Sequence, residues 1–265
     1  MLPFLILIFS AYPLFIISFY FFSGCSPYNI DLKNIFLPPF VDFDFPFGTN
    51  EFGQNLACMI GKGMLNSLKV SSFASFVSFA LGTALGLISG YFGGIRDLLI
   101  SRLIDFFQGF PSLVFVIFIV AIFGGGDDKI ILSLTIFGWT SFARIVRVEA
   151  MRLKESDFVL SARVIGLSST MIILKYVLPF VVPAVFTQLF FSFSAFILAE
   201  GGLGFLGLRP AKSLSLGAII SDEMDYIMTY PRLVIFPGLA LTSLVVIFNL
   251  LGQYIMKNKR RNRSL

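Results

Sequence analysis

Residue types that catalyse reactions or hold metals are scarce in this chain. It contains no His, and its two Cys, Cys25 and Cys58, have a spacing that fits no metal framework. Without His, neither a Ser–His nor a Cys–His pair can form, and the commonest metal ligand is missing. We therefore expect no catalytic residue, no cofactor and no metal site, and we expect the chain not to be an enzyme by itself.

Two sequence matches to nucleotide-binding motifs lack the context that such motifs need. Gly202-x-Gly204-x-x-Gly207 fits the dinucleotide pattern, but no strand precedes it and no βαβ unit surrounds it. Gly61-Lys62 has neither the upstream Gly nor the following Ser or Thr of a phosphate-binding loop. The paired carboxylates Asp127 and Asp128 lie in a Gly-rich turn, where a solvated turn is the simpler interpretation. None of these segments indicates nucleotide hydrolysis.

The charged residues gather instead in one segment, from Glu149 to Pro179. Acidic and basic residues crowd its first half, a single glycine follows at Gly166, and apolar sequence resumes at Leu178-Pro179. Glu149 to Arg163 has an amphipathic helical pattern, Gly166 permits a reversal, and Leu167 to Val177 reads as a second helix. A passive loop is the alternative. A passive loop seldom has about 30 residues with helical patterning, so we expect a helical elbow that binds a soluble partner.

Apolar runs dominate the rest of the chain. The sequence of 265 residues is 57% hydrophobic and 13% charged, with 34 Phe, and a helix needs about 20 apolar residues to cross a bilayer. The predicted spans are residues 2–22, 70–92, 111–126, 130–146, 178–199 and 233–256. The third and fourth are separated by Gly124–Lys129, which predicts a tight helical hairpin. Because the runs do not alternate, a membrane β-barrel is excluded.

The distribution of charge predicts how the spans are oriented. Most of the 20 Lys and Arg lie on the side of the two termini, including the segment 144–175 and the tail 257–265. The other side carries acidic clusters near residues 42–51, 127–128 and 222–225. Basic residues favour the cytoplasmic side, so we expect both termini and the elbow in the cytoplasm of a bacterium, at its inner membrane. The net charge of +5 is then a signal of topology and not of nucleic-acid binding.

The predicted organisation has one membrane domain and no repeats. Residues 1–25 form a first transmembrane anchor, residues 26–69 an extracytoplasmic loop and pre-helix, residues 70–256 the main transmembrane domain, and residues 257–265 a basic tail. The outer loop is rich in Pro and Phe, so we expect it to lie along the outer membrane face. Direct contact with the lipid bilayer is expected throughout.

The elbow resembles the cytoplasmic motif of binding-protein-dependent ABC importer permeases. Ala162-Arg163-x-x-Gly166, followed by Tyr176-x-Leu178-Pro179, matches the latter part of that motif. The resemblance implies contact with ATPase subunits, with Gly166 setting the elbow angle and the small Ala162 packing against the ATPase groove. The residues it assigns to ATPase coupling are Glu155, Asp157, Leu160, Ser161, Ala162, Arg163, Gly166, Leu178 and Pro179.

Further blocks resemble the dipeptide, oligopeptide and nickel branch, the C-type permease. Pro46–Gly53 (PFGTNEFG) is similar to one signature, and Glu200–Leu208 with Gly217–Asp222 is similar to another. The blocks run in family order from about residue 45 to 255. The resemblance implies an all-α membrane protein with six transmembrane helices and the type I, MetI-like permease core. The residues to which it gives structural roles are Pro46, Gly48, Gly53, Glu200, Gly204, Gly207 and Asp222.

Several positions depart from the family pattern. Leu160 stands where the motif has Glu, and Ser161 stands where it has Ala, so a charged contact would be lost or supplied by Glu155 or Asp157. Asn50 replaces an Asp in the outer signature. An ion pair made by that Asp in relatives therefore cannot form here.

The resemblance also implies partners and cargo. They are a homologous permease subunit, two ATP-binding ABC subunits, and an extracytoplasmic solute-binding protein, with peptide as cargo and alternating access driven by ATP. Nickel or a metal chelate is the alternative cargo within the family. A standalone secondary transporter is the alternative of another class, although such proteins place ionisable residues in mid-membrane and the centres of these spans have almost none.

Overall fold

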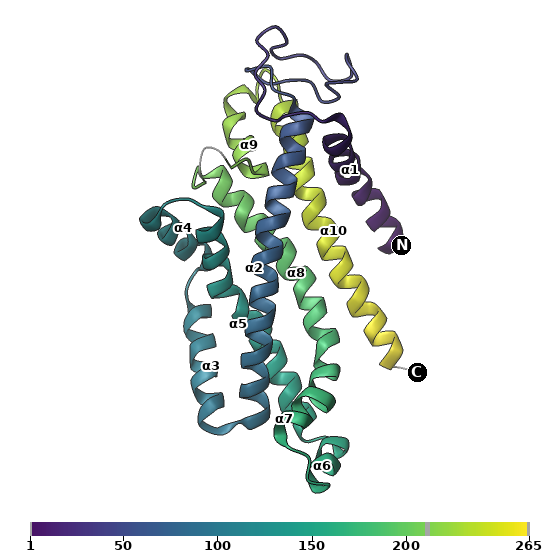
Figure 1. Ribbon diagram of the computed structural model, residues 1–265, viewed down its shortest axis with the longest axis vertical. Helices are drawn as coiled ribbons and strands as arrows, with labels where there is room; N and C mark the ends of the chain where they lie inside the picture. The colour runs from purple at the N-terminus through teal and green to yellow at the C-terminus, as the bar shows by residue number, and fades with distance from the viewer. Residues whose placement is uncertain (1, 210–212, 264–265) are drawn as a thin grey trace. The chain divides into compact units, whose positions relative to one another are not determined.

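The computed structural model describes residues 2–209 and 213–263, and most of these residues are helical (Figure 1). A single isolated bridge between Thr49 and Asn55 is the strand-like feature. The helices are α1 (Leu2–Ser23), α2 (Leu56–Phe92), α3 (Gly94–Gly109), α4 (Ser112–Phe123), α5 (Asp127–Lys154), α6 (Asp157–Val164), α7 (Ser169–Ile172), the π-helical η1 (Ile173–Val177), α8 (Leu178–Phe205), α9 (Leu216–Asp222), the 3-10 helix η2 (Met224–Tyr226) and α10 (Arg232–Arg263). The last two residues of the predicted basic tail, 264 and 265, lie outside the described residues.

Five of the described helices are long and apolar enough to cross a membrane, and a sixth span exists if α3 and α4 count as one. These two helices meet at an angle of 80°. The predicted third span, residues 111–126, is corrected, because α4 has only 12 residues. At 1.5 Å per residue it is about 18 Å long, well short of the hydrocarbon core. The second span also differs, since α2 begins at Leu56, 14 residues before the expected start at residue 70.

The chain divides into two compact units. Unit 1 comprises Met1–Ser72, Ile119–Ile130 and Phe193–Leu250, and unit 2 comprises Phe73–Phe118, Ile131–Ser192 and Leu251–Leu265. The core of unit 1 is formed by buried apolar side chains of α1, α2, α9 and α10, among them Ile16, Ile60, Ile219 and Leu233. In unit 2, α3 and α5 share a smaller core.

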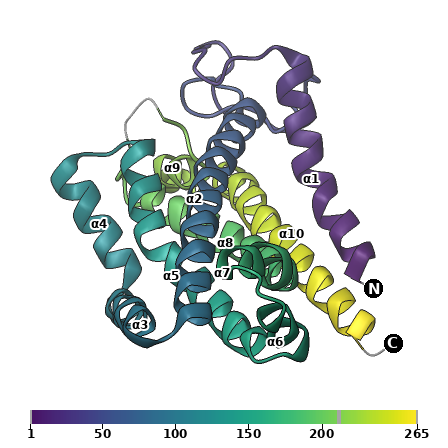
Figure 2. The same ribbon diagram turned by 60° about the horizontal axis from the view of Figure 1, so that its bottom comes forward.

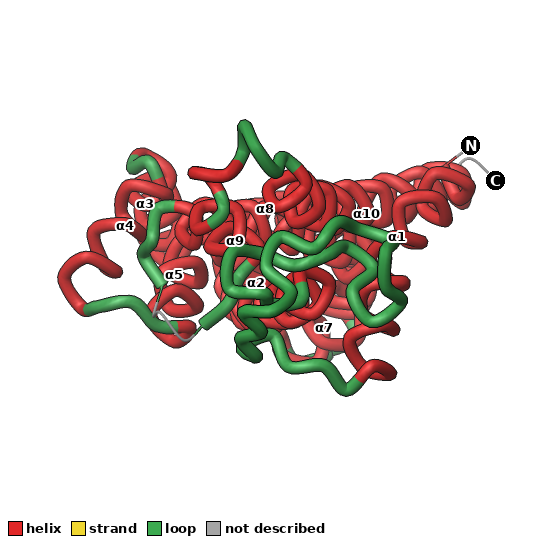
Figure 3. The backbone as a smooth tube through the Cα atoms, turned by 90° about the horizontal axis from the view of Figure 1, so that it is seen from above, coloured by secondary structure: helices red, strands yellow, loops and turns green. Residues whose placement is uncertain are grey.

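Residues 24–55, here called the cap, connect α1 to α2 and lie over the N-terminal end of α2 (Figures 1 and 3). A disulfide joins Cys25 at the start of the cap to Cys58 in α2. No pairing was predicted for either cysteine, so this link is a correction. At Gly53 the backbone has φ of +68°, and a Cβ atom would overlap the carbonyl oxygen of Asp31. Only glycine fits this position, which explains its structural role in the signature.

Close helix packing organises unit 2. Gly82, Gly86 and Gly90 lie at four-residue intervals on α2, and the space that a side chain would need at each is occupied by α5. Such spacing of small residues lets two membrane helices approach closely. Near the end of this contact Arg147 of α5 donates hydrogen bonds to both carboxylate oxygens of Asp97 in α3, at 2.5 and 2.8 Å. This bidentate pair fixes α3 to α5.

Candidate functional site

The elbow contains one more helix break than the sequence predicts. The expected continuous helix from Glu149 to Arg163 is wrong, because α5 ends at Lys154 and α6 begins at Asp157. At the break, Ser156 has an extended backbone, and its Oγ donates to the carbonyl of Leu153 at 2.5 Å. A serine side chain that satisfies the local backbone competes with helix formation. Figure 2 shows α6 folded back beside the C-terminal end of α5.

Gly166 ends α6 in a Schellman turn. Its φ is +89°, its N–H donates to the carbonyl of Arg163 at 3.0 Å, and the N–H of Leu167 donates to the carbonyl of Ala162 at 3.2 Å. These two bonds satisfy carbonyl groups that a helix end would otherwise leave unpaired. The turn therefore holds a defined angle between α6 and the segment that follows.

The two faces of α6 differ sharply in exposure. Val159 is fully buried and Ala162 is 3% exposed, so both pack against the chain itself. Val164 is 88% exposed and Ile165 is 78% exposed. The side chain of Ala162 therefore faces inward, and the apolar Val164 and Ile165 form the outward surface.

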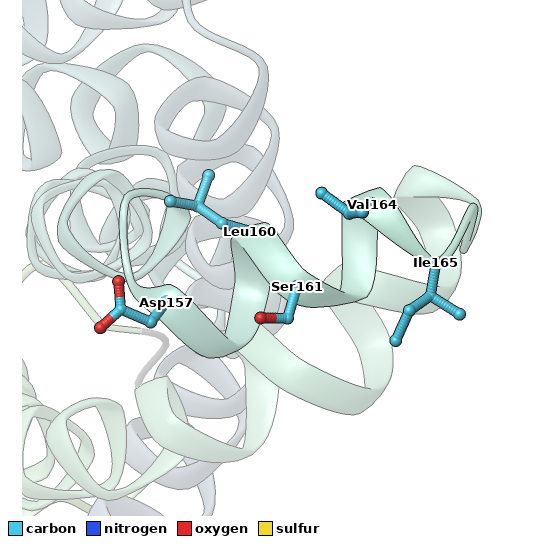
Figure 4. A pocket seen from close by; sticks show the side chains of 5 residues that line it. All are labelled: Asp157, Leu160, Ser161, Val164 and Ile165. Atoms are coloured by element: carbon cyan, nitrogen blue, oxygen red, sulfur yellow. The ribbon is translucent and has the colours of Figure 1, made fainter.

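The outward face of α6 has a shallow hollow, called here the elbow face (Figure 4). Its lining residues are Asp157, Leu160, Ser161, Val164 and Ile165. Asp157 lies at the N-terminal end of the helix and is the charged group of the set (Figure 4). The arrangement suits an apolar protein surface with a donor near Asp157. Glu155 and Arg163 are exposed as well, but they do not line the hollow.

Contacts on the inner side tie α6 to the membrane helices of unit 2. The rings of Phe158 and Phe180 lie 5.2 Å apart, and the guanidinium of Arg163 lies over the ring of Tyr91 at 5.9 Å. Beyond Gly166, the helical segment starting at Ser169 continues through η1 into α8, where Leu178 and Pro179 form the first turn. The chain thus runs from the turn at Gly166 into α8, and the contact between Phe158 and Phe180 packs α6 against the start of α8.

A buried ion-pair network in unit 1 includes Glu200, the first residue of the second signature block. Arg209 pairs with Glu200 of α8 and, at 2.6 Å, with Asp127 of α5. The side chains of Glu200 and Arg209 are 0% and 2% exposed. Glu200 was predicted to have a structural role, but its pairing with Arg209 was not predicted. The interpretation of Asp127 as a residue of a solvated turn is wrong, because its carboxylate also pairs with Arg209. The signal that could have indicated the pair is Arg209 itself, which follows Glu200 by nine positions.

The chain turns sharply beside this network. Gly207, with φ of +70°, follows the end of α8. A Cβ atom on Gly204 would overlap the hydroxyl of Ser215, which caps α9 by accepting from the N–H of Ala218 at 3.1 Å. Gly204 thus permits the close approach of α8 and α9, whereas Gly207 supplies the left-handed backbone conformation of the turn.

Carboxylates of the cap and of the segment after α9 meet in a third cluster. Asn50 Nδ2 donates to Glu223 Oε1 at 3.0 Å, and the hydroxyl of Tyr226 donates to Glu51. Asn50, which replaces the family Asp, therefore supplies a donor where an Asp would add another negative charge. Burial and the nearby Glu51 raise the pKa of Asp222. In the cap that carries these groups, Gly48 is buried and Pro46 is partly buried.

The position of Glu223 predicts a pH effect on stability. Burial, with smaller contributions from Glu51 and Asp222, raises the pKa of Glu223 to about 6 from 4.5, against the opposing hydrogen bond from Asn50. Because this pKa is raised in the folded state, the contribution of Glu223 to the free energy of unfolding is greatest below pH 4.5. It is lost as the pH rises through 6, by up to about 2 kcal/mol. In Glu223→Gln this loss should disappear, so the variant should melt higher than the native protein at pH 8 and equally at pH 4.5. Equal melting at pH 8 would contradict the assignment.

Comparison with known proteins identifies the family. The family described as binding-protein-dependent transport system inner membrane component matches residues 82–261. The chain belongs to this family. The matched region of the permease contains the elbow, the ion-pair network and most of α10, and it begins after the cap.

Three relatives show the extent of the similarity. Dipeptide transport system permease protein DppC of Alkalihalophilus pseudofirmus is 36% identical over 207 residues, which are 78% of this chain and 68% of that protein. DppC of Lactococcus lactis subsp. cremoris is 34% identical over 78% of this chain and 61% of that protein. Oligopeptide transport system permease protein OppC of Haemophilus influenzae is 36% identical over 78% of this chain and 67% of that protein. The permease thus spans 61% to 68% of the length of these relatives.

Solved structures share the fold of the permease. An inward-facing MetNI methionine ABC transporter chain superposes with a TM-score of 0.61, at 20% identity, over 76% of this chain and 95% of that chain. A chain of an amino acid ABC transporter gives a TM-score of 0.58 at 17% identity, over 77% of this chain and 94% of that chain. The expected MetI-like helical fold is therefore confirmed.

Proposed function

We propose that this permease is one of two membrane-spanning subunits of an ATP-driven importer of dipeptides or oligopeptides. A homologous permease would complete the translocation path, two ABC subunits would hydrolyse ATP, and an extracytoplasmic binding protein would deliver the peptide. The names of the relatives, which are dipeptide, oligopeptide and glutathione permeases, favour peptide over nickel or a metal chelate.

The observation that carries the proposal is the two-sided character of α6. Val159 and Ala162 anchor it inward, whereas Val164 and Ile165 are exposed beside Asp157. An apolar surface on a charged segment outside the spans fits a groove on a soluble partner. ATP binding would then favour one arrangement of the elbows, and the continuous helix from Ser169 to Phe205 would carry that bias into the membrane.

Uptake of a labelled dipeptide tests the proposal. The permease would be co-expressed with its partner subunits and binding protein in a strain that lacks other peptide importers. We expect ATP-dependent accumulation of the dipeptide and none of nickel. Accumulation of nickel alone, or accumulation that persists without the ABC subunits, would contradict the proposal.

The disulfide supports a definite orientation. Disulfides persist outside the bacterial cytoplasm, so the bond between Cys25 and Cys58 favours an extracytoplasmic cap and, because α1 crosses the membrane once, a cytoplasmic N-terminus. In intact cells, a membrane-impermeant maleimide should label Tyr28→Cys in the cap and should not label Val164→Cys in the elbow. Labelling of Val164→Cys without permeabilisation would reverse the orientation.

A further inference from the structure

We propose that the tip of the cap and the C-terminal half of α1 form a binding site for the acyl chain of an outer-leaflet phospholipid with an amine headgroup. The site rests on the membrane location of α1 and not on the cargo of the importer. It therefore stands or falls independently of peptide transport.

The site is an apolar hollow of about 250 Å³ within unit 1. Its apolar walls are the rings of Phe15 and Phe19 on α1 and the side chains of four cap residues, Phe40, Val41, Phe43 and Pro46. One charged group, Asp42, lies at the same hollow. A narrow apolar space with a single charge matches one lipid chain and its headgroup better than it matches a polar solute.

The cap residues of the hollow are far more exposed than apolar side chains in water should be. Phe40, Val41 and Phe43 are 79%, 67% and 99% exposed. Phe40 has φ of +64°, a conformation that bulky residues seldom adopt. The hydrogen bond from its N–H to the carbonyl of Pro46, at 3.2 Å, fixes this turn. The cap thus exposes the apolar side chains of Phe40, Val41 and Phe43 within four positions of the chain. Such a group of exposed apolar side chains indicates an interaction surface.

The hollow continues a surface that already faces lipid. The 22-residue α1 is long and apolar enough to cross a membrane, and Pro13 and Ile16 are its buried residues, so most of its surface is open to lipid. Phe19 lies four residues before the end of the helix at Ser23, about 6 Å along the axis. That depth corresponds to the boundary between headgroups and acyl chains. A lipid chain lying on Phe15 and Phe19 therefore enters the hollow without leaving the bilayer.

Charge selects the headgroup. Asp42 and the nearby Asp44 form no ion pair among the residues that the structure describes. Two carboxylates at the headgroup level repel anionic lipid and attract an ammonium group. Phosphatidylethanolamine meets both requirements, an apolar chain for the hollow and a cation for its rim.

Tryptophan fluorescence with brominated lipids tests the site. The complete importer carrying Phe43→Trp would be placed in vesicles of phosphatidylethanolamine with bromine on the acyl chains, and the signal of the native Trp139 would be subtracted. Phe52→Trp is the matched control, since Phe52 is a half-exposed cap residue outside the hollow. We expect at least twofold stronger quenching of the residue at position 43 than of that at position 52. Bromines near the headgroup should quench more than those near the chain end.

Three results would overturn the site. One is equal quenching at the two positions with strong quenching of Phe43→Trp by aqueous acrylamide, which would place the tip in water. Another is protection of position 43 only after the binding protein is added, which would make the tip a protein surface. The headgroup is tested separately. Quenching of Phe43→Trp should be weaker in phosphatidylglycerol vesicles than in phosphatidylethanolamine vesicles, and Asp42→Asn should remove this difference. The third contradicting result is equal quenching in both lipids when Asp42 is present, which would refute the amine preference.

Discussion

Replacement of Arg209 by Met is expected to destabilise the permease by about 3–5 kcal/mol, because it leaves Glu200 as a fully buried carboxylate without its cation. The midpoint temperature of thermal unfolding should fall by about 10 °C. It would be measured on the purified protein in mild detergent, by size-exclusion chromatography after heating. The double variant Glu200→Gln with Arg209→Met removes both charges. It should recover most of the loss, since a buried pair is costly mainly when one partner is missing.

The control for this prediction is an exposed ion pair of similar composition. Arg144 and Asp105 lie 3.6 Å apart with side chains that are 52% and 63% exposed. Arg144→Met should therefore change stability by less than about 1 kcal/mol. A fall in stability in Arg144→Met as large as that in Arg209→Met, or no fall in either variant, would contradict the stabilising role of the buried network in unit 1.

Substitution of Val164 by Arg is expected to abolish ATP-driven uptake while leaving the permease folded. Val164 is 88% exposed on the elbow face, so Arg is tolerated in the free subunit. In the assembled importer the charge would be forced into an apolar contact, weakening association with the ABC subunits by about 30-fold or more. Co-purification with the ABC subunits and uptake by whole cells would measure the two effects.

Met228→Arg provides the control, because Met228 is 92% exposed and lies in unit 1 after η2. It should leave association with the ABC subunits unchanged. Val159→Asp gives the opposite contrast, since Val159 is fully buried and its substitution should reduce the amount of folded protein. Normal uptake by Val164→Arg would remove the elbow face from the mechanism.

The sequence predicted the membrane class, the elbow and the turn at Gly166, because each depends on local chemistry. Apolar runs, a charged segment and one glycine are visible without knowledge of long-range contacts. The break at Ser156 was missed, because serine is compatible with a helix until its hydroxyl is seen to bond to the carbonyl of Leu153. The inward orientation of Ala162 was missed for a related reason: small size fits close packing on either side of a helix.

Long-range pairings were beyond the sequence. Arg209 is separated from Asp127 by 82 positions, and Asn50 from Glu223 by 173. No local pattern relates such residues. The disulfide is an intermediate case. The predicted topology places both cysteines outside the cytoplasm, where a disulfide can form, but their spacing was compared only with that of metal sites. The bend between α3 and α4 was hidden because their junction, Phe110-Pro111, reads as a boundary and gives no angle.

The most direct test of the elbow is cross-linking from single cysteines on α6. Cys25 and Cys58 are paired in the native chain, so a cysteine introduced at 164 or 162 is the reactive thiol. In the assembled importer, a short bifunctional maleimide should join Val164→Cys to an ABC subunit, with a yield that changes when ATP is added. Ala162→Cys should give no such product, because its side chain faces inward. Equal cross-linking from both positions, or none to an ABC subunit from Val164→Cys, would contradict the proposed coupling surface.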